Sequence, residues 1–280
     1  MEGVVGFRFG RNKGPIKPGI AHWSAAMMML GAPALPALPA AVDNSRGIAA
    51  WGALGNDHYN DCTCAAYYHA RQVWALATGR ADADSMLTMD GEADALALYA
   101  AVSGFDLAAQ PDPAQPNPTD QGAYESDVLA YAHNTGAPVG NAGALEQLLA
   151  FVQIDPRQQD DLRYAIWQCG VAYVAFQCPT SWGTASPAYT GLTTWDAPAD
   201  GSDPPDPDAG HAVILLGFGG GAFKAISWGR IITVTPAFIA AYVDEAYALA
   251  DPAWIGATGR SPLGLSVAQL ENLMDALKMD

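Results

Sequence analysis

Cys62 and His211 are the two residues whose types and positions best fit enzymatic chemistry. Cys62 comes directly after a turn-rich segment, 55–61, and opens a stretch with helical patterning that stops at Gly79. The positive end of a helix stabilises the thiolate of a cysteine in its first turn, and the thiolate is the nucleophilic form. Such a nucleophile needs a base, and His211 opens a strand-like segment about 150 residues farther along the chain. The sequence therefore predicts a cysteine nucleophile with a histidine as its general base and acid.

The chain is long and apolar enough to build its own core, and it is strongly acidic. Its 280 residues are 50% hydrophobic and 10% aromatic, which is typical of a globular protein rather than a disordered one. Asp and Glu number 29 against 13 Lys and Arg, which gives a net charge of −16. Such a surface repels phosphate groups, so the composition argues against nucleic-acid partners and against binding to an anionic membrane.

No segment predicts a membrane span or a secretory signal. Runs of about 18 or more apolar residues are absent. The apolar stretch 25–41 is interrupted by prolines and lies behind a glycine-rich basic segment, which is unlike a signal peptide.

The cysteines indicate free thiols in a reducing compartment such as the cytoplasm. There are four of them, at positions 62, 64, 169 and 178. Four are too few for a disulfide scaffold, and they lack the paired CxxC spacing of zinc sites. The sequence therefore gives no reason to expect a cofactor or a metal.

Proline and glycine patterning separates an N-terminal arm from a folded body. Residues 1–54 have few periodic segments and many Gly and Pro, which predicts an extended arm. Four of the 13 basic residues fall within its first 17 positions, namely Arg8, Arg11, Lys13 and Lys17. A basic arm of this kind is either a solvated tail or a strap that docks on an acidic surface, where it would serve protein partners or self-assembly.

The body, 55–280, begins with helical patterning. Periodicity predicts helices over 62–78, 90–102, 120–132, 143–153 and 157–168. Thr119 or Asp120 is expected to cap the third of them, and Gly136 to follow its end. These segments make up a predicted helical half, about 55–168.

Strand patterning follows in a predicted sheet half, about 169–260. Alternation and bounding turns predict antiparallel strands over 170–177, 211–218, 222–229 and 230–234. The segment 196–210, rich in Asp and Pro, is expected to be a surface loop. Pro236 opens a helix, and Ser266 opens a C-terminal one, about 265–279. Helices first and strands afterwards predict an α+β fold in one domain.

Three short motifs in the body resemble those of the papain-like cysteine peptidases. Gly-His-Ala-Val at 210–213, Leu-Gly-Phe at 216–218 and Ser-Trp-Gly at 227–229 look like the family's GHAV, GY and NSWG segments. The resemblance implies a papain-like α+β fold, in which a nucleophile helix packs against an antiparallel sheet with a cleft between them. A weaker likeness, the GND-x-x-x-DC pattern that ends at Cys62, is similar to uncharacterised papain-like proteins of phages and prophages.

The resemblance also gives Asn56 a role. This residue stands six positions before Cys62, where the family has a glutamine whose amide helps to form the oxyanion hole. An asparagine amide is shorter but can donate the same hydrogen bond. The segment 119–122 likewise looks like the family's segment ahead of its second-half helices. The implied catalytic set is Cys62, His211 and Asn56.

The sequence departs from the family pattern at several positions. Ile226 occupies the place of the asparagine that orients the histidine, and isoleucine forms no hydrogen bond through its side chain. Ser227 is adjacent, but strand alternation is expected to point it to the opposite face. Asp61 is expected to oppose a thiolate at Cys62 and raise its pKa. Thr63 replaces the bulky residue common after the nucleophile.

Other interpretations of the same residues stay open. Cys62 could be only a small buried hydrophobic residue. Cys64 could be the nucleophile instead, with His58 at the six-residue offset. The aspartates of the segment 196–210 are candidate Ca²⁺ ligands, although a mobile flap beside His211 is favoured over a metal site.

Two functions from different classes fit the sequence. The first is a papain-like cysteine hydrolase acting on a peptide or amide, with activity weakened because Ile226 replaces the orienting asparagine. The second is a catalytically silent papain-fold protein with a structural or binding role, for example a component of a phage virion. The corresponding location is the cytoplasm or a virion.

Overall fold

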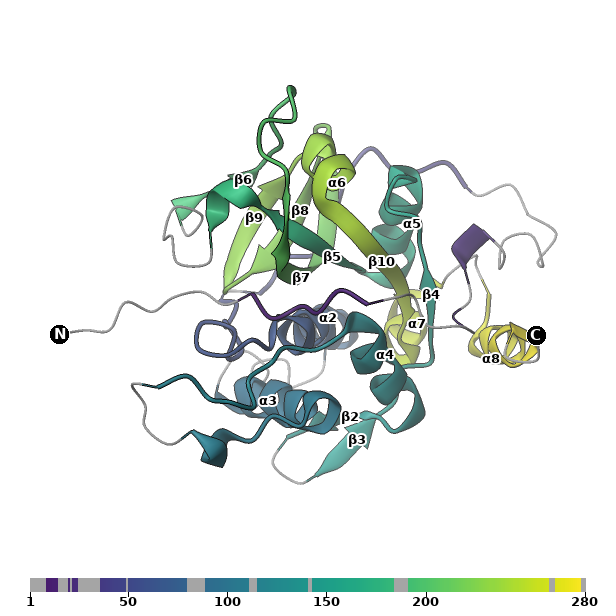
Figure 1. Ribbon diagram of the computed structural model, residues 1–280. Helices are drawn as coiled ribbons and strands as arrows, with labels where there is room; N and C mark the ends of the chain where they lie inside the picture. The colour runs from purple at the N-terminus through teal and green to yellow at the C-terminus, as the bar shows by residue number, and fades with distance from the viewer. Residues whose placement is uncertain are drawn as a thin grey trace.

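The computed structural model describes residues 9–14, 20, 22–24, 36–48, 50–79, 89–110, 115–140, 143–183, 191–261 and 265–277. These residues form a mixed α+β structure, in which a largely antiparallel sheet lies on one side and a group of helices on the other (Figure 1). The predicted α+β class is therefore confirmed. None of the helices within these ranges combines the length and the apolar composition that a membrane crossing requires.

Within the described residues the sheet has eight strands, and its centre is the pair β5 and β7. Along the sheet the order is β4 (Ala150–Gln153), β10 (Val243–Ala250), β5 (Ala172–Pro179), β7 (Pro205–Gly219), β8 (Ala222–Ser227), β9 (Arg230–Val234) and β6 (Thr194–Trp195). The short strand β1 (Val42–Asp43) also pairs with β7, and among the described strands β6 and β9 are the one parallel pair. A separate two-stranded ribbon joins β2 (Ala137–Val139) to β3 (Ala144–Glu146).

Helices cover both faces of this sheet. On the face that bears the predicted nucleophile lie α2 (Cys62–Thr78), α3 (Met89–Ser103), α4 (Glu125–Asn134) and α7 (Pro252–Thr258). We call α2, α3 and α4 the helical side. The other face carries α5 (Gln159–Cys169) and α6 (Pro236–Tyr242), and α8 (Val267–Leu277) lies near β4. Two short 3-10 turns complete the described elements, Leu107–Ala109 and Thr180–Trp182.

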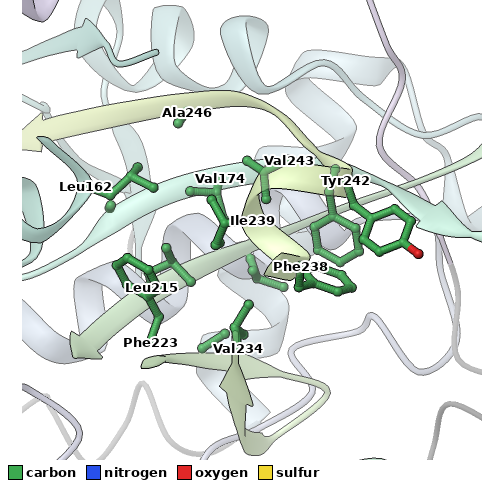
Figure 2. Packing of buried hydrophobic residues seen from close by; sticks show 14 of the residues in the cluster. Leu162, Val174, Leu215, Phe223, Val234, Phe238, Ile239, Tyr242, Val243 and Ala246 are labelled. Atoms are coloured by element: carbon green, nitrogen blue, oxygen red, sulfur yellow. The ribbon is translucent and has the colours of Figure 1, made fainter. Parts of the chain in front are cut away.

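Strand alternation separates the two large clusters of the core among the described residues. Odd- and even-numbered residues of β7 point to opposite faces, so Leu215 joins the cluster beneath α5 and α6 while Ile214 joins the cluster beneath α2. Figure 2 shows the first cluster, where strand residues such as Val174 meet Phe238 and Ile239 of α6. The two clusters fix the sheet between its helices and hold its central strands rigidly.

Several predicted elements are confirmed. Helix α2 begins at Cys62 and stops at Gly79, whose left-handed φ of 65° closes the last turn as glycine permits. Thr235 caps α6 by accepting from the Phe238 N–H, and Pro236 is the first helical residue. The strands predicted around His211 and the two after it form β7, β8 and β9.

Other predicted elements are wrong, and in each case tertiary contacts decide. The segment 143–153 contains β3 and β4 instead of a helix, because β4 is buried and pairs with β10 at the sheet edge. The last six residues of the predicted loop 196–210 belong to β7, which starts at Pro205. Helix α4 starts at Glu125 rather than at 120, because the Asp120 carboxylate accepts hydrogen bonds from the Asn60 N–H and the Tyr99 hydroxyl.

Part of the N-terminal arm lies inside the molecule. Residues 9–14, drawn in dark purple, cross the middle of the structure between the sheet and the helical side (Figure 1). Arg11 is 5% exposed and forms an isolated parallel bridge with Ala123. For these residues the expectation of a solvated tail is wrong, because they pack on the body of their own chain. Arg8 and Lys17 lie outside the described residues.

Candidate active site

The first turn of α2 places the Cys62 thiol against the sheet. Its side chain is 1% exposed and packs with Ala175 of β5 and Ala212 of β7. Burial raises the pKa of Cys62 to about 12. The backbone N–H groups of Gly10 and Ala212 donate to the sulfur and act in the opposite direction. Asp61 also raises this pKa, as the sequence predicted, but burial is the larger cause.

Asp61 itself is fully buried beside the thiol. Burial raises its pKa well above the ordinary range, while the side chain of Asn56 lowers it in part. A carboxyl that keeps its proton carries no charge to oppose a thiolate. Where Asp61 is protonated it does not oppose a thiolate at Cys62, and where it is ionised it raises the pKa of Cys62.

His211 is held on two sides near the start of the buried part of β7. Its Nε2 lies 2.8 Å from the Ser227 Oγ on β8, and its ring stacks on Trp228 with centroids 4.4 Å apart and planes 15° from parallel. Trp228 has a φ of 48°, a left-handed conformation that bulky residues rarely adopt, in the turn between β8 and β9. Burial lowers the pKa of His211 to about 3, so the imidazole is neutral. Among the described residues its Nδ1 has no hydrogen-bond partner.

The Ser227 side chain faces His211. The expectation that strand alternation points Ser227 away from the histidine is therefore wrong. Ile226 pairs in register with Ile214, and both side chains enter the core beneath α2. Alternation along each strand then puts His211 and Ser227 together on the other face. The Ile226 side chain therefore points away from the edge of the His211 ring that carries Nε2. The Ser227 hydroxyl forms the hydrogen bond at that edge.

The three predicted site residues and Ser227 line one small cavity. Its volume is about 10 Å³, roughly the space of one water molecule. Asn56 lines it with Cys62 and His211, is 2% exposed, and donates from Nδ2 to the Tyr59 carbonyl at 3.1 Å. The structure thus brings together a thiol, an imidazole, a hydroxyl and a side-chain amide.

His69 is a further cavity residue, and it was not among the site residues expected from the sequence. It lies two turns after Cys62 on the same face of α2, a spacing that could have revealed it. Its Nε2 is 2.9 Å from the Gly52 carbonyl oxygen, and burial lowers its pKa to about 4. Two neutral imidazoles therefore border the thiol.

The segment 9–12, which we call the cleft segment, crosses directly over Cys62. The Arg11 N–H donates to the Gly210 carbonyl at 3.0 Å, and the Ala123 N–H donates to the Gly10 carbonyl at 2.9 Å. These bonds connect the residue before His211 to the loop ahead of α4. A Cβ at Gly10 would lie 1.8 Å from the Asn60 carbonyl oxygen, so only glycine fits there. The cleft segment closes the site in this conformation.

Phe9 continues the closure over the histidine. Its ring centroid is 5.7 Å from that of His211 and 6.0 Å from that of Trp228, both edge to face. Nothing in the spacing of Gly and Pro predicted this contact. In the sequence, the only sign of this contact is that Phe9 and Gly10 stand between two basic residues, Arg8 and Arg11.

The described residues form no second active site around Cys64 and no metal site in the segment 196–210. Cys64 is in the core beneath α2, and the His58 side chain is 58% exposed and pairs with Asp57. The Asp203 carboxylate accepts from the N–H and hydroxyl of Ser181. Across the described ranges, no group of three or more His, Cys, Asp or Glu side chains is arranged to hold a metal ion.

Several solved structures that superpose on this chain are of cysteine proteases. Xylellain, a cysteine protease from Xylella fastidiosa, superposes with a TM-score of 0.60 over 87% of this chain and 96% of its own, at 13% identity. The chain has the papain-like fold. Procathepsin L 3 from the larval midgut of Tenebrio molitor gives a TM-score of 0.50 at 17% identity, over 78% of this chain and 72% of its own.

A ragweed pollen protein extends the comparison. The proform of the cysteine protease Amb a 11 gives a TM-score of 0.51 at 13% identity, over 83% of this chain and 74% of its own. In sequence, no family model and no curated protein matches the chain. At these identities the likeness establishes the papain-like fold, and the chemistry has to be argued from the residues.

Proposed function

We propose that the protein is a papain-like cysteine hydrolase, a peptidase or amidase, that is held latent by its own N-terminal arm. One observation carries the proposal. His211 is fixed by Ser227 and Trp228 with its Nδ1 unbonded among the described residues, in the same cavity as the Cys62 thiol at a helix start. This arrangement supports transfer of the thiol proton to Nδ1.

The proposed reaction is acyl transfer in two steps. His211 Nδ1 takes the proton from Cys62 Sγ, and the thiolate attacks the substrate carbonyl carbon. The Cys62 N–H and the Asn56 amide stabilise the negative oxygen. His211 then gives the proton to the leaving amine, which leaves an acyl-enzyme thioester. Water, deprotonated by His211, hydrolyses the thioester and restores the thiol.

Latency follows from the cleft segment. With residues 9–12 in place, Cys62 is 1% exposed and no peptide can reach its sulfur. Burial favours the neutral thiol and the neutral imidazole, with pKa values of about 12 and about 3. Displacement of the segment would hydrate both groups and favour the thiolate–imidazolium pair.

A catalytically silent binding protein is the second candidate. Its support is the same closure, because a thiol that is never uncovered never reacts. In that case the fold would serve only to hold its N-terminal arm or a partner.

The test compares the full-length chain with Gly10→Ala, alone and with Cys62→Ala. The new Cβ cannot fit beside the Asn60 carbonyl, so Gly10→Ala displaces the cleft segment. We expect peptide hydrolysis by Gly10→Ala and none once Cys62 is also replaced. A folded Gly10→Ala protein that cleaves no peptide mixture and leaves Cys62 unlabelled by an electrophile between pH about 5 and about 9 would establish the silent alternative.

A further inference from the structure

The side chain of Arg11 fills a buried acidic pocket next to the candidate nucleophile. One of its terminal nitrogens is 2.7 Å from Glu245 Oε2 and 2.9 Å from Asp244 Oδ1. The other donates to Gln177 Oε1 at 2.8 Å and to Asp244 Oδ2 at 3.3 Å. The buried Glu125 at the start of α4 also attracts the guanidinium electrostatically. We call Glu125, Gln177, Asp244 and Glu245 the guanidinium pocket.

The pocket is rigid and built for this group. The Gln177 amide nitrogen donates to two backbone carbonyls at 2.9 Å, which turns its carbonyl oxygen toward Arg11. The Tyr247 hydroxyl donates to Glu245 Oε1 at 2.6 Å, which leaves Oε2 for the guanidinium. Acceptors held in these positions favour Arg over Lys, because only the planar guanidinium presents paired N–H donors to them.

The pocket also holds more acid than Arg11 neutralises. Glu125 is 0% exposed, and neither of its carboxylate oxygens has a hydrogen-bond partner within the described part of the chain. Lys13 meets Asp244 at 2.7 Å, but its side chain is 57% exposed and lies at the pocket's outer edge. Burial raises the pKa of Glu125 well above its ordinary range, and Arg11 acts in the opposite direction. Three carboxyl groups thus surround one guanidinium at this buried site.

The position of the pocket links it to the reaction. Arg11 follows Gly10, whose N–H donates to the Cys62 sulfur. The Arg11 backbone lies between the Gly210 carbonyl and Ala123, on the two sides of the site. Any peptide that replaced the cleft segment across Cys62 would therefore pass the pocket within one or two residues of the attacked carbonyl.

We propose that the guanidinium pocket is a specificity subsite, and that the hydrolase acts on peptides with an arginine next to or one residue away from the cleaved bond. The inference rests on the proposed hydrolase function. Arg11 occupies the subsite intramolecularly, and substrate arginine takes its place when the cleft segment leaves. Substrate recognition and latency thus use the same four side chains.

The experiment uses full-length Gly10→Ala/Arg11→Ala, which frees both the nucleophile and the pocket. Quenched-fluorescent peptides of alanine and glycine carry one arginine or, as the uncharged isostere, one citrulline. We expect kcat/KM to be at least about tenfold higher for the arginine peptide, since hydrogen bonds to charged groups discriminate by that factor. Mass spectrometry should locate cleavage within two residues of the arginine. Adding Glu245→Gln should reduce the preference, whereas the exposed Glu271→Gln on α8 should not.

A binding measurement separates failure of this inference from failure of the hydrolase proposal. The same two peptides are titrated calorimetrically into the double variant with Cys62→Ala added. Equal cleavage of both peptides would overturn the subsite and leave the hydrolase. Absence of all cleavage, with tighter binding of the arginine peptide, would overturn the hydrolase and support the pocket as an arginine site. No cleavage and equal binding would overturn both. If the double variant does not fold, the same assays are performed with Gly10→Ala alone.

Discussion

His211 Nε2 and Ser227 Oγ lie 2.8 Å apart, on the same face of neighbouring strands β7 and β8. This contact and the Trp228 ring fix the imidazole plane, and Nδ1 is the ring nitrogen that has no hydrogen-bond partner among the described residues. In the proposed cycle Nδ1 takes and releases the proton while Nε2 keeps its own, so Nε2 donates to the Ser227 hydroxyl oxygen in both protonation states of the ring. Ser227 can therefore orient His211 through a proton-transfer cycle without an asparagine.

Replacing Ser227 tests this orienting role. In the Gly10→Ala background, Ser227→Ala should lower kcat by up to about tenfold, because one neutral hydrogen bond to the histidine is lost. KM should stay nearly constant, since Ser227 does not touch the scissile group. Ser227→Thr keeps the hydroxyl and should retain most of the activity. Steady-state kinetics of the three proteins decide, and equal kcat values for the serine and alanine proteins would exclude the role.

The accessibility of Cys62 should depend on Gly10. We expect iodoacetamide to modify Cys62 slowly in the wild-type chain, because the thiol is buried and its pKa is raised to about 12. Gly10→Ala should raise the rate at least about tenfold by displacing the cleft segment and hydrating the thiol. Peptide mapping by mass spectrometry gives the rate for each cysteine.

Gly256→Ala is the matched control for that experiment. This glycine lies in α7, and a Cβ there would meet nothing within 4 Å. The substitution should leave Cys62 as protected as in the wild-type chain. Modification of Cys62 at the same rate in all three proteins would show that the cleft segment does not govern access.

The sequence was sufficient to predict the nucleophile helix and the strand of the histidine. Turn residues before Cys62, the glycine at its far end and the alternation after His211 are local signals, and the residues that carry them are contiguous. The α+β class followed from the order of such segments. These predictions depended on no knowledge of how distant segments pair.

The features that the sequence did not reveal all depend on pairing between distant segments. Ser227 faces His211 because Ile226 pairs with Ile214 between neighbouring strands. The sequence of one strand does not determine that register. Strand β4 looked helical because its apolar run is short, and only its pairing with β10 makes it a strand. Arg11 looked like a tail residue because its acidic partners lie at positions 125 and beyond.

Asn56 should matter for the transition state more than for substrate binding. In the Gly10→Ala background, Asn56→Ala removes an amide donor from the cavity, and kcat should fall about 10²–10³-fold with little change in KM. Asn56→Gln restores an amide on a longer side chain and should recover part of the loss. If the alanine variant instead raised KM and left kcat intact, Asn56 would be a substrate-binding residue.

The free energy of unfolding should fall in mild acid because His211 is buried in its neutral form. Its pKa is about 3 in the folded state, against an ordinary value of 6.5. As the pH drops below 6.5, His211 binds a proton in the unfolded chain, but in the folded chain it stays neutral down to about pH 3. The free energy of unfolding that is present above pH 6.5 is therefore progressively lost. His69, with a pKa of about 4, acts in the same direction, whereas Asp61 and Glu125, whose pKa values are raised, act in the opposite one.

Comparing variants isolates the contribution of one histidine. Each pKa unit corresponds to about 1.4 kcal/mol, so between pH about 6.5 and about 4.5 His211 should cost the wild-type protein about 2–3 kcal/mol that His211→Gln does not lose. Urea unfolding at both pH values measures the difference. His58→Gln, at an exposed side chain, should track the wild type. Parallel pH profiles for the wild type and His211→Gln would mean that the imidazole is hydrated in the folded protein, and the cleft segment would then be open in solution.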